Sequence, residues 1–191
     1  IVGNATLESS IVRTGAGSLK ISPASGAQGY WRPDSSVFTL GVTYCRFYTR
    51  ITSLPATSAR VLVGDVAGLN VIVNPNGTLR LRSATTPFSS ESTVALTDTS
   101  KWYRIEVECN GSTSILYIDG VNAASGTNAS ALNILSFGAN DTIADTYTAY
   151  FDDICFDGAS LPGAGKSVLL VPISDNARDT LWTGGAGGTT N

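Results

Sequence analysis

The stretch Lys101–Gly120, "KWYRIEVECNGSTSILYIDG", decides the fold. The odd positions from 103 to 109 hold Tyr, Ile, Val and Cys, and the even positions between them are charged. A period of two places these sets on opposite faces of one strand. Asn110-Gly111 then offers two residues that tolerate positive φ, as a tight type I′ hairpin requires. The stretch therefore predicts an antiparallel hairpin with one apolar face, closed by a second turn at Asp119-Gly120.

Short alternating runs separated by turn residues continue along most of the chain, and runs of helical period are nearly absent. Short strands without intervening helices are typical of an all-β, antiparallel two-sheet β-sandwich. We predict strands at residues 18–22, 29–32, 42–51, 60–63, 69–73, 78–82, 93–96, 102–109, 113–118, 131–137 and 146–156.

The length of 191 residues fits one domain of about 150 residues with an appendage. We predict that the sandwich occupies residues 1–157. Residues 158–166, "GASLPGAGK", have the composition of a flexible linker. Residues 167–191 are too poor in apolar side chains to fold alone, so we expect them to dock on another surface or to lead into another domain. The chain begins at Ile1 and has no Met, which leaves open whether it was cleaved or belongs to a longer polypeptide.

The composition argues against several classes of protein. Charged residues are 14% of the chain and the net charge is -3, whereas a nucleic-acid-binding domain needs a basic face. The sequence has no apolar run of membrane-spanning length, and no signal peptide.

The three cysteines fall in predicted strands. Because their number is odd, complete internal pairing is excluded. We expect reduced core thiols, with one disulfide between neighbouring strands as the alternative. The chain contains no His and no C-x-x-C, which argues against zinc.

Three stretches resemble one family. "WYRIEVECNGSTSILYIDGV" resembles the central hairpin of concanavalin A-like, laminin-G-like jelly rolls, and "TAYFDDICFD" resembles their closing strand. "GAGSLKIS" is similar to the opening strand of many carbohydrate-binding relatives. The resemblance covers about residues 4–157 and implies a jelly roll. It implies no single function, because this fold hosts lectins, glycosidases, lyases and adhesion modules.

The C-terminal stretch "LLVPISDNARDTLWTGGAGGTTN" is similar to the segment that follows such jelly rolls in minor tail proteins of tailed bacteriophages. This resemblance implies a virion structural protein that is oligomeric within an assembly. Its expected partners are other virion proteins or a host-surface glycan. The alternative is an extracellular carbohydrate-binding module of a secreted bacterial polysaccharide-active enzyme.

Catalytic sets are missing, so we predict that the chain is not an enzyme. Glu106 and Glu108 share a strand face, as the carboxylates of a glycoside hydrolase could. However, the glucanase arrangement E-x-D-x-x-E is absent, and Arg104 on the same face favours ionised carboxylates over a proton donor. We therefore expect a solvated face or an interface there. The lack of His also excludes Ser-His-Asp and Cys-His catalysis.

The strand at residues 42–51 is the first candidate binding surface. One of its faces is apolar, and the other alternates aromatic rings with guanidinium groups. Tyr rings stack on the C–H faces of sugars, and Arg donates forked hydrogen bonds to hydroxyls or carboxylates. The residues on that face are Tyr44, Arg46, Tyr48 and Arg50.

A second outward pair, Arg80 and Arg82, lies on a later strand. If both strands belong to the concave sheet, they form one positive surface that suits an acidic glycan or a neighbouring subunit. The alternative is that these side chains cover the sheet against its own loops. Tyr30 and Trp31 are adjacent, so one of them must face away from the core. Trp31 is therefore also a candidate anchor, with core packing as its alternative.

Asp152 and Asp153 are a weak candidate for a metal site. In calcium-binding relatives, an acidic residue of the closing strand often holds a structural Ca²⁺. The resemblance therefore implies the same role for Asp152 or Asp153. Asn4 and Glu8 could contribute oxygen ligands, of which Ca²⁺ needs six to eight. The alternative is a simple pair of acids at a strand end. We expect no other cofactor.

Overall fold

The computed structural model describes residues 1–32, 43–64, 68–83, 86–87, 89–109, 112–127, 136–157 and 160–163. The predicted extension at 167–191, the first turn at Asn110-Gly111 and residues 131–135 of one predicted strand lie outside these ranges. In the described part, no helix is long and apolar enough to span a membrane.

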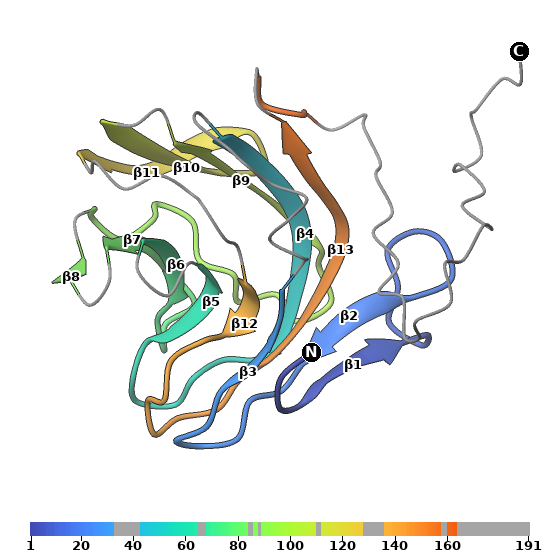
Figure 1. The fold of residues 1–191 in the computed structure, drawn as a ribbon. Coiled ribbons are helices and arrows are strands. Elements are labelled where there is room, and N and C mark those ends of the chain that lie inside the picture. The colour runs from blue at the N-terminus through green and yellow to red at the C-terminus, as the bar shows by residue number, and fades with distance from the viewer. Residues whose placement is uncertain are drawn as a thin grey trace, which may run out of the picture.

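The chain forms a β-sandwich of two antiparallel sheets, which confirms the predicted fold class (Figure 1). The long strands β4 and β13 lie side by side and curve over the other layer. The seven-stranded sheet has the order β1 (Ala5–Glu8), β2 (Ser18–Ile21), β13 (Thr148–Asp157), β4 (Thr43–Ser53), β9 (Tyr103–Cys109), β10 (Thr113–Ile118) and β11 (Val121–Thr127). The six-stranded sheet has the order β3 (Gly29–Trp31), β12 (Ser136–Ala139), β5 (Arg60–Gly64), β6 (Leu69–Val73), β7 (Leu79–Ser83) and β8 (Thr86–Pro87).

Most predicted strands agree with the structure to within two residues. The strand expected at residues 93–96 is wrong, because this segment makes only an isolated bridge from Ala95 to Thr78. Three strands were not predicted: β1, β8 and β11. They are very short, or they lack a clear alternation of apolar and polar residues.

The apolar face of the hairpin lies in the core, as predicted. Ile105 is fully buried, and Tyr103, Val107 and Cys109 are at most 5% exposed. Aromatic rings join the two layers: the ring centre of Phe137 on β12 lies 5.5 Å from that of Phe47 and 5.7 Å from that of Phe151. These contacts fix the sheets face to face.

The three cysteines are free and buried in the sandwich. Burial raises the pKa of Cys45 well above its ordinary value and that of Cys109 to about 11. A thiol that ionises only in strongly alkaline solution is a poor nucleophile at neutral pH.

Candidate functional site

The predicted surface on β4 lies on the outer face of the seven-stranded sheet, and much of it is covered. Arg46 is 1% exposed and Tyr48 is 8% exposed, while Tyr44 and Arg50 are half-buried. The inner residues Cys45, Phe47, Thr49 and Ile51 are buried against the other sheet. Alternation therefore assigned the faces of β4 correctly, but the outer face is not open.

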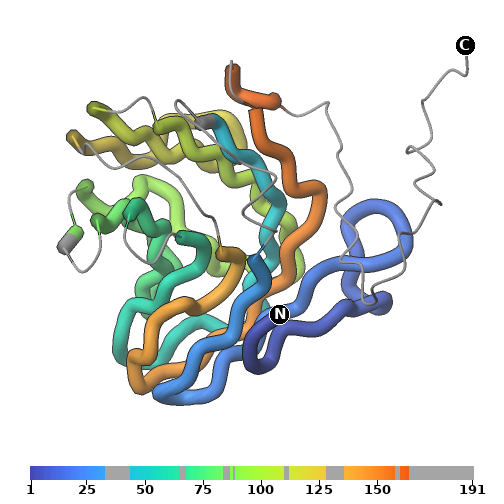
Figure 2. The backbone as a smooth tube through the Cα atoms, viewed as in Figure 1, coloured from blue at the N-terminus to red at the C-terminus, as the bar shows by residue number. Residues whose placement is uncertain are grey.

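The loop between β1 and β2 provides one part of this cover (Figure 2). The guanidinium of Arg13 lies 3.4 Å from the ring centre of Tyr48 and forms an ion pair with Asp153. Asp152 Oδ2 accepts hydrogen bonds from the backbone N–H groups of Arg13 and Thr14, at 2.9 and 3.2 Å. The loop is thus fixed across the outer side of β4 and β13.

Residues 160–163 provide the second part of the cover over the outer face of β4. Arg46 and Glu106 both bind Gly163, and we call these contacts the Gly163 clamp. Arg46 Nη1 donates to the carbonyl oxygen of Gly163 at 2.5 Å, and Glu106 Oε1 accepts from the N–H of Gly163 at 3.2 Å. Both backbone groups of one residue are therefore bound by buried charged side chains. This part of the expected flexible linker lies on the sheet.

The clamp excludes the first of the two expectations for Glu106, a solvated face. Glu106 is only 3% exposed, because the chain returns over it, and its Oε2 lies 3.1 Å from Nε of Arg104. Glu108 is half-buried and accepts from the hydroxyl of Tyr117 at 3.3 Å. The two glutamates thus have separate partners on a covered sheet.

Arg80 and Arg82 lie on β7 in the six-stranded sheet, so they do not share a surface with the β4 residues. One combined positive surface required both strands to belong to the same sheet, and they do not. Instead, the structure brings Arg80 and Arg82 together with residues of β3, β6 and β12. We call this set the arginine face: Tyr30, Arg32, Asn70, Arg80, Arg82 and Ser136.

Strand register arranges part of the arginine face in one row across the sheet. Asn70 is paired with Arg82, and Gly64 stands between Asn70 and Ser136. Arg32 Nε extends the row by donating to Oγ of Ser136 at 2.9 Å. From Arg32 to Arg82 the row crosses four strand spacings, about 19 Å at roughly 4.8 Å each.

The other members of the arginine face lie beside this row. Arg80 is paired with Ile72 and donates to the carbonyl oxygen of Ser89 through Nε and Nη2, at 3.3 and 3.1 Å. The guanidinium of Arg32 lies 5.1 Å from the ring centre of Tyr30. The three arginines and Tyr30 are half-buried.

Arg82 and Asn70 have polar atoms without partners. The Arg82 side chain is 12% exposed, and among the described residues its polar contact is an ion pair at 3.9 Å to Asp141. Its Nε is buried without a hydrogen bond, and burial lowers the pKa of the guanidinium. Asn70 is 2% exposed, and its Oδ1 likewise has no partner. Buried polar atoms are normally satisfied. In the described residues Arg46 Nε, Thr49 Oγ1 and Arg104 Nε of the seven-stranded sheet also have no hydrogen-bond partner, but Arg82 and Asn70 differ in being direct neighbours across two strands.

Gly64 places the amide of Asn70. A Cβ atom at position 64 would come within 2.1 Å of Asn70 Oδ1, so the amide lies directly against the glycine backbone. Asn70 Nδ2 donates to the carbonyl oxygen of Gly68 at 3.1 Å, which leaves Oδ1 as the free acceptor. A larger residue at position 64 would displace the amide.

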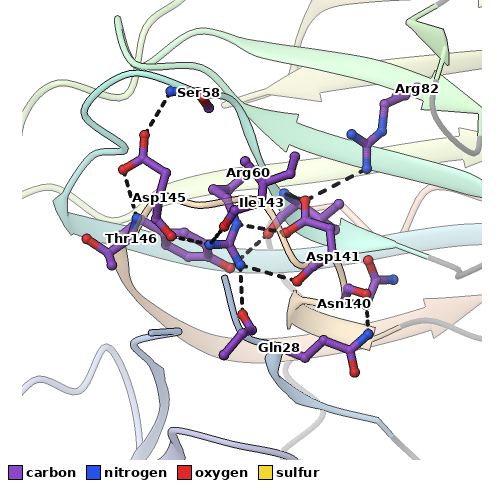
Figure 3. A network of polar contacts seen from close by, with 12 residues as sticks. Gln28, Ser58, Arg60, Arg82, Asn140, Asp141, Ile143, Asp145 and Thr146 are labelled. Atoms are coloured by element: carbon purple, nitrogen blue, oxygen red, sulfur yellow. Dashed lines mark hydrogen bonds and ion pairs between the residues drawn. The ribbon is translucent and has the colours of Figure 1, made fainter. Parts of the chain in front are cut away.

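A neighbouring network of polar contacts fixes the loops at the edge of the arginine face (Figure 3). Arg60 is fully buried, and its Nε donates to Asp141 Oδ1 at 2.7 Å. Its other donors reach backbone carbonyl oxygens of Ala27, Asp141, Ile143 and Asp145. Asp141 is therefore shared by a fully bonded Arg60 and a nearly unbonded Arg82.

Asp145 holds a second loop in place through its carboxylate. Its oxygens accept from the backbone N–H groups of Ala56, Thr57 and Ser58, at 3.1, 2.7 and 2.8 Å, and from that of Thr146 at 2.8 Å. These donors stabilise the ionised form and hold the pKa of Asp145 well below its usual range.

Trp31, the remaining binding candidate, packs against the core. Its ring centre lies 5.9 Å from that of Phe137, and the side chain is half-buried. Its neighbour Tyr30 points to the opposite side, onto the arginine face. The aromatic residue available for a ligand is therefore Tyr30.

The oxygens of Asp152 and Asp153 do not fit the weakly predicted calcium site. Those of Asp152 accept backbone N–H groups, and those of Asp153 accept the Thr14 hydroxyl and the Arg13 guanidinium. A cation would have to replace that guanidinium. In the described ranges, no group of three or more His, Cys, Asp or Glu side chains is placed to hold a metal ion.

Sequence reasoning missed Asn70, Ser136 and Arg32 as candidate binding residues. A polar Asn within the apolar run "LNVIV" was the available signal for Asn70. Ser136 and Arg32 are brought next to Asn70 only by strand order, which the sequence pattern does not reveal.

No protein-family model matches the chain, and no curated protein matches its sequence. Solved structures resemble it at low identity. "Cellulose induced protein, Cip1" matches with a TM-score of 0.67 and 15% identity, over 85% of this chain and 88% of that one. The carbohydrate-binding module CBM66 from Bacillus subtilis matches at 0.52 and 12%, over 81% and 92%. Alginate lyase AlgAT5 of polysaccharide lyase family 7 matches at 0.54 and 8%, over 76% and 80%. These likenesses establish the fold that the chain shares with both binding modules and enzymes.

Proposed function

We propose that this chain is a lectin-like β-sandwich module that binds carbohydrate through the arginine face and has no catalytic role. The observation that carries the proposal is the Arg82–Asn70 pair. A shielded guanidinium and a shielded amide oxygen lie side by side with unused hydrogen-bonding capacity. A polar ligand that both donates and accepts would satisfy them, and sugar hydroxyls do both.

Two further features support a carbohydrate ligand. Tyr30 is a half-buried aromatic ring on the arginine face, and such rings pack against the C–H faces of sugars. The likeness to the carbohydrate-binding module CBM66 makes binding by this fold reasonable, although fold alone does not fix function.

The setting that we propose is a bacteriophage virion, with the module used for assembly or for adhesion to a host-surface glycan. The C-terminal stretch after residue 168 supports this setting by its similarity to minor tail proteins. The alternative is a binding module of a secreted polysaccharide-active enzyme, which the likeness to CBM66 supports equally.

A glycan array tests both the proposal and the setting. The full chain is labelled and applied to bacterial surface glycans and to storage and cell-wall polysaccharide fragments. We expect specific signals that disappear in the double variant Arg32→Gln/Arg82→Gln. The matched control is Arg50→Gln on the opposite sheet, where Arg50 Nε donates to the Thr99 carbonyl.

The outcomes separate the alternatives. Signals confined to bacterial surface glycans favour the virion setting, and signals confined to polysaccharide fragments favour the enzyme module. A protein that binds no glycan on either set contradicts the proposed function. Signals lost in Arg50→Gln but kept in the double variant would move the site to the seven-stranded sheet.

A further inference from the structure

We infer that the ligand of the arginine face is an extended acidic glycan, with a sugar carboxylate at Arg82 and a neighbouring hydroxyl donating to Asn70. This inference rests on the proposed function and names its ligand class. It follows from the charge of the arginine face, from the two atoms without partners and from the length of the row.

The charge of the arginine face favours an anion. It holds three guanidinium groups, from Arg32, Arg80 and Arg82. Glu91 lies near Arg80: hydrogen bonds from Thr78 and Asn76 and, less strongly, the charge of Arg80 lower the pKa of Glu91. Asp141 forms an ion pair with Arg82 at 3.9 Å, but it also forms one with Arg60 at 2.7 Å. One carboxylate between two arginines leaves Arg82 incompletely neutralised. An incoming carboxylate would supply the missing charge and accept the forked N–H groups.

Asn70 restricts the ligand further, because its free atom is an acceptor. A simple anion such as acetate offers Oδ1 of Asn70 no donor at neutral pH, whereas a sugar hydroxyl does. Arg82 and Asn70 are directly paired across β6 and β7, so their side chains are neighbours on one face. A carboxylate and a hydroxyl on the same sugar ring match this spacing, as in uronic and sialic acids.

The row from Arg32 to Arg82 favours a chain of sugars over a single one. Arg32 uses Nε for Ser136, which among the described residues leaves its terminal N–H groups for a ligand, and its strand lies about 19 Å from that of Arg82. Two arginines at the ends of one row can engage acidic groups on separate sugars.

Isothermal titration calorimetry on the full chain tests the inference. The probes are oligogalacturonate, oligomannuronate, hyaluronan fragments and sialyllactose, each beside its carboxyl-reduced counterpart, with acetate as the simple anion that has no donor. We expect at least one acidic probe to bind at least about tenfold more tightly than its reduced form, since one charge-assisted hydrogen bond is worth about ten- to a hundredfold in affinity. We also expect acetate to bind far more weakly, and binding of the acidic probe to weaken with salt.

Variants locate the effect. Arg82→Gln is expected to abolish the preference for the acidic probe, and Arg82→Lys to keep part of it because the charge remains without the fork. Asn70→Leu should weaken acidic and reduced probes alike, since both carry the hydroxyl. Gly64→Ala is expected to act like Asn70→Leu by displacing the amide. Arg50→Gln is the control, and thermal melting confirms that each variant is folded.

The outcomes distinguish this inference from the proposed function. Equal affinity for acidic and reduced probes, with Arg82→Gln unchanged, overturns the acidic ligand but leaves carbohydrate binding intact. Acetate that competes as strongly as the acidic glycan overturns the role of Asn70. If the chain binds neither these probes nor any glycan on the array, the proposed function itself is contradicted.

Discussion

The outer faces of the two sheets both carry arginines, but those arginines have different surroundings. On the seven-stranded sheet, Arg46 is 1% exposed and donates to two backbone carbonyls, those of Gly163 and Asp153, although its Nε has no partner. On the six-stranded sheet, the Arg82 side chain is 12% exposed, its Nε likewise has no partner, and within the described residues its guanidinium reaches only Asp141, at 3.9 Å. The first pattern belongs to a charge that stabilises the fold. The second pattern is what we expect of a charged side chain that binds a ligand.

The contrast is sharpest at Asp141, which two arginines share. Arg60 directs its donors to the Asp141 carboxylate and to four backbone carbonyls, whereas Arg82 approaches the same carboxylate only to 3.9 Å. Arg60 and Arg82 therefore differ in hydrogen bonding although both lie beside Asp141. The difference should appear in the free energy of unfolding when each arginine is substituted.

The largest loss of stability is expected for Arg60→Leu. The substitution leaves Asp141 without its close partner and several buried carbonyls without a donor, so the free energy of unfolding should fall by about 3–5 kcal/mol. Urea denaturation measures it. Arg50→Leu, a half-buried arginine with one bond to Thr99, should cost less than about 1 kcal/mol. Equal losses in the two variants would contradict the assignment of Arg60 as a structural charge.

Arg46→Met is expected to have the next largest effect. Met fills much of the same volume but leaves the Gly163 and Asp153 carbonyls unpaired, at roughly 1–3 kcal/mol for each buried group. We expect a loss of about 2–4 kcal/mol in urea denaturation. Backbone amides of residues 160–163 should also exchange faster in hydrogen-exchange measurements. Unchanged exchange there would show that the Gly163 clamp does not hold this segment.

Asp145→Asn is expected to have a smaller effect that depends on pH. The folded pKa of Asp145 lies below its unfolded value of about 3.9, so its stabilising contribution is present above about pH 4 and is lost as the pH falls toward the folded pKa. Wild type should therefore be more stable than Asp145→Asn at pH 7, with the difference shrinking below about pH 4. Comparing both proteins cancels the opposite contribution of Asp152, whose pKa is raised by burial. A difference that is constant from pH 7 to pH 3 would contradict the prediction.

Arg82→Gln is expected to have the smallest effect on stability. Arg82 has no hydrogen bond to the described residues, and Asp141 keeps Arg60 as its partner, so the free energy of unfolding should change by less than about 0.5 kcal/mol. Thermal melting and urea denaturation measure the change. A loss comparable to that of Arg46→Met would show that Arg82 is a structural charge, and the comparison of the two faces would fail.

The hairpin and the face assignments were predictable because alternation is a local property. It correctly directed Ile105 and Val107 to the core and separated Arg46 from Phe47. Alternation does not tell which sheet a strand joins, so it could not separate the β4 residues from Arg80 and Arg82. It also could not foresee cover by distant segments, since the Arg46–Gly163 contact joins positions 117 residues apart.

The candidate site was predicted only in part for the same reason. Arg80 and Arg82 were chosen because two outward arginines recur at a period of two. Asn70 became a candidate only when its partner strand and its free Oδ1 were known. An unsatisfied atom is a property of the assembled fold, and a sequence pattern contains no signal for it.

The position of Gly163 has a practical consequence for how this protein is presented to its surroundings. Gly163 is held on the outer side of the seven-stranded sheet, and a sandwich has its two outer faces on opposite sides. A support or fluorophore attached at position 163 itself would thus lie on the opposite side of the sandwich from Arg82. Attachment at that position should leave the arginine face accessible to large polymers in solution.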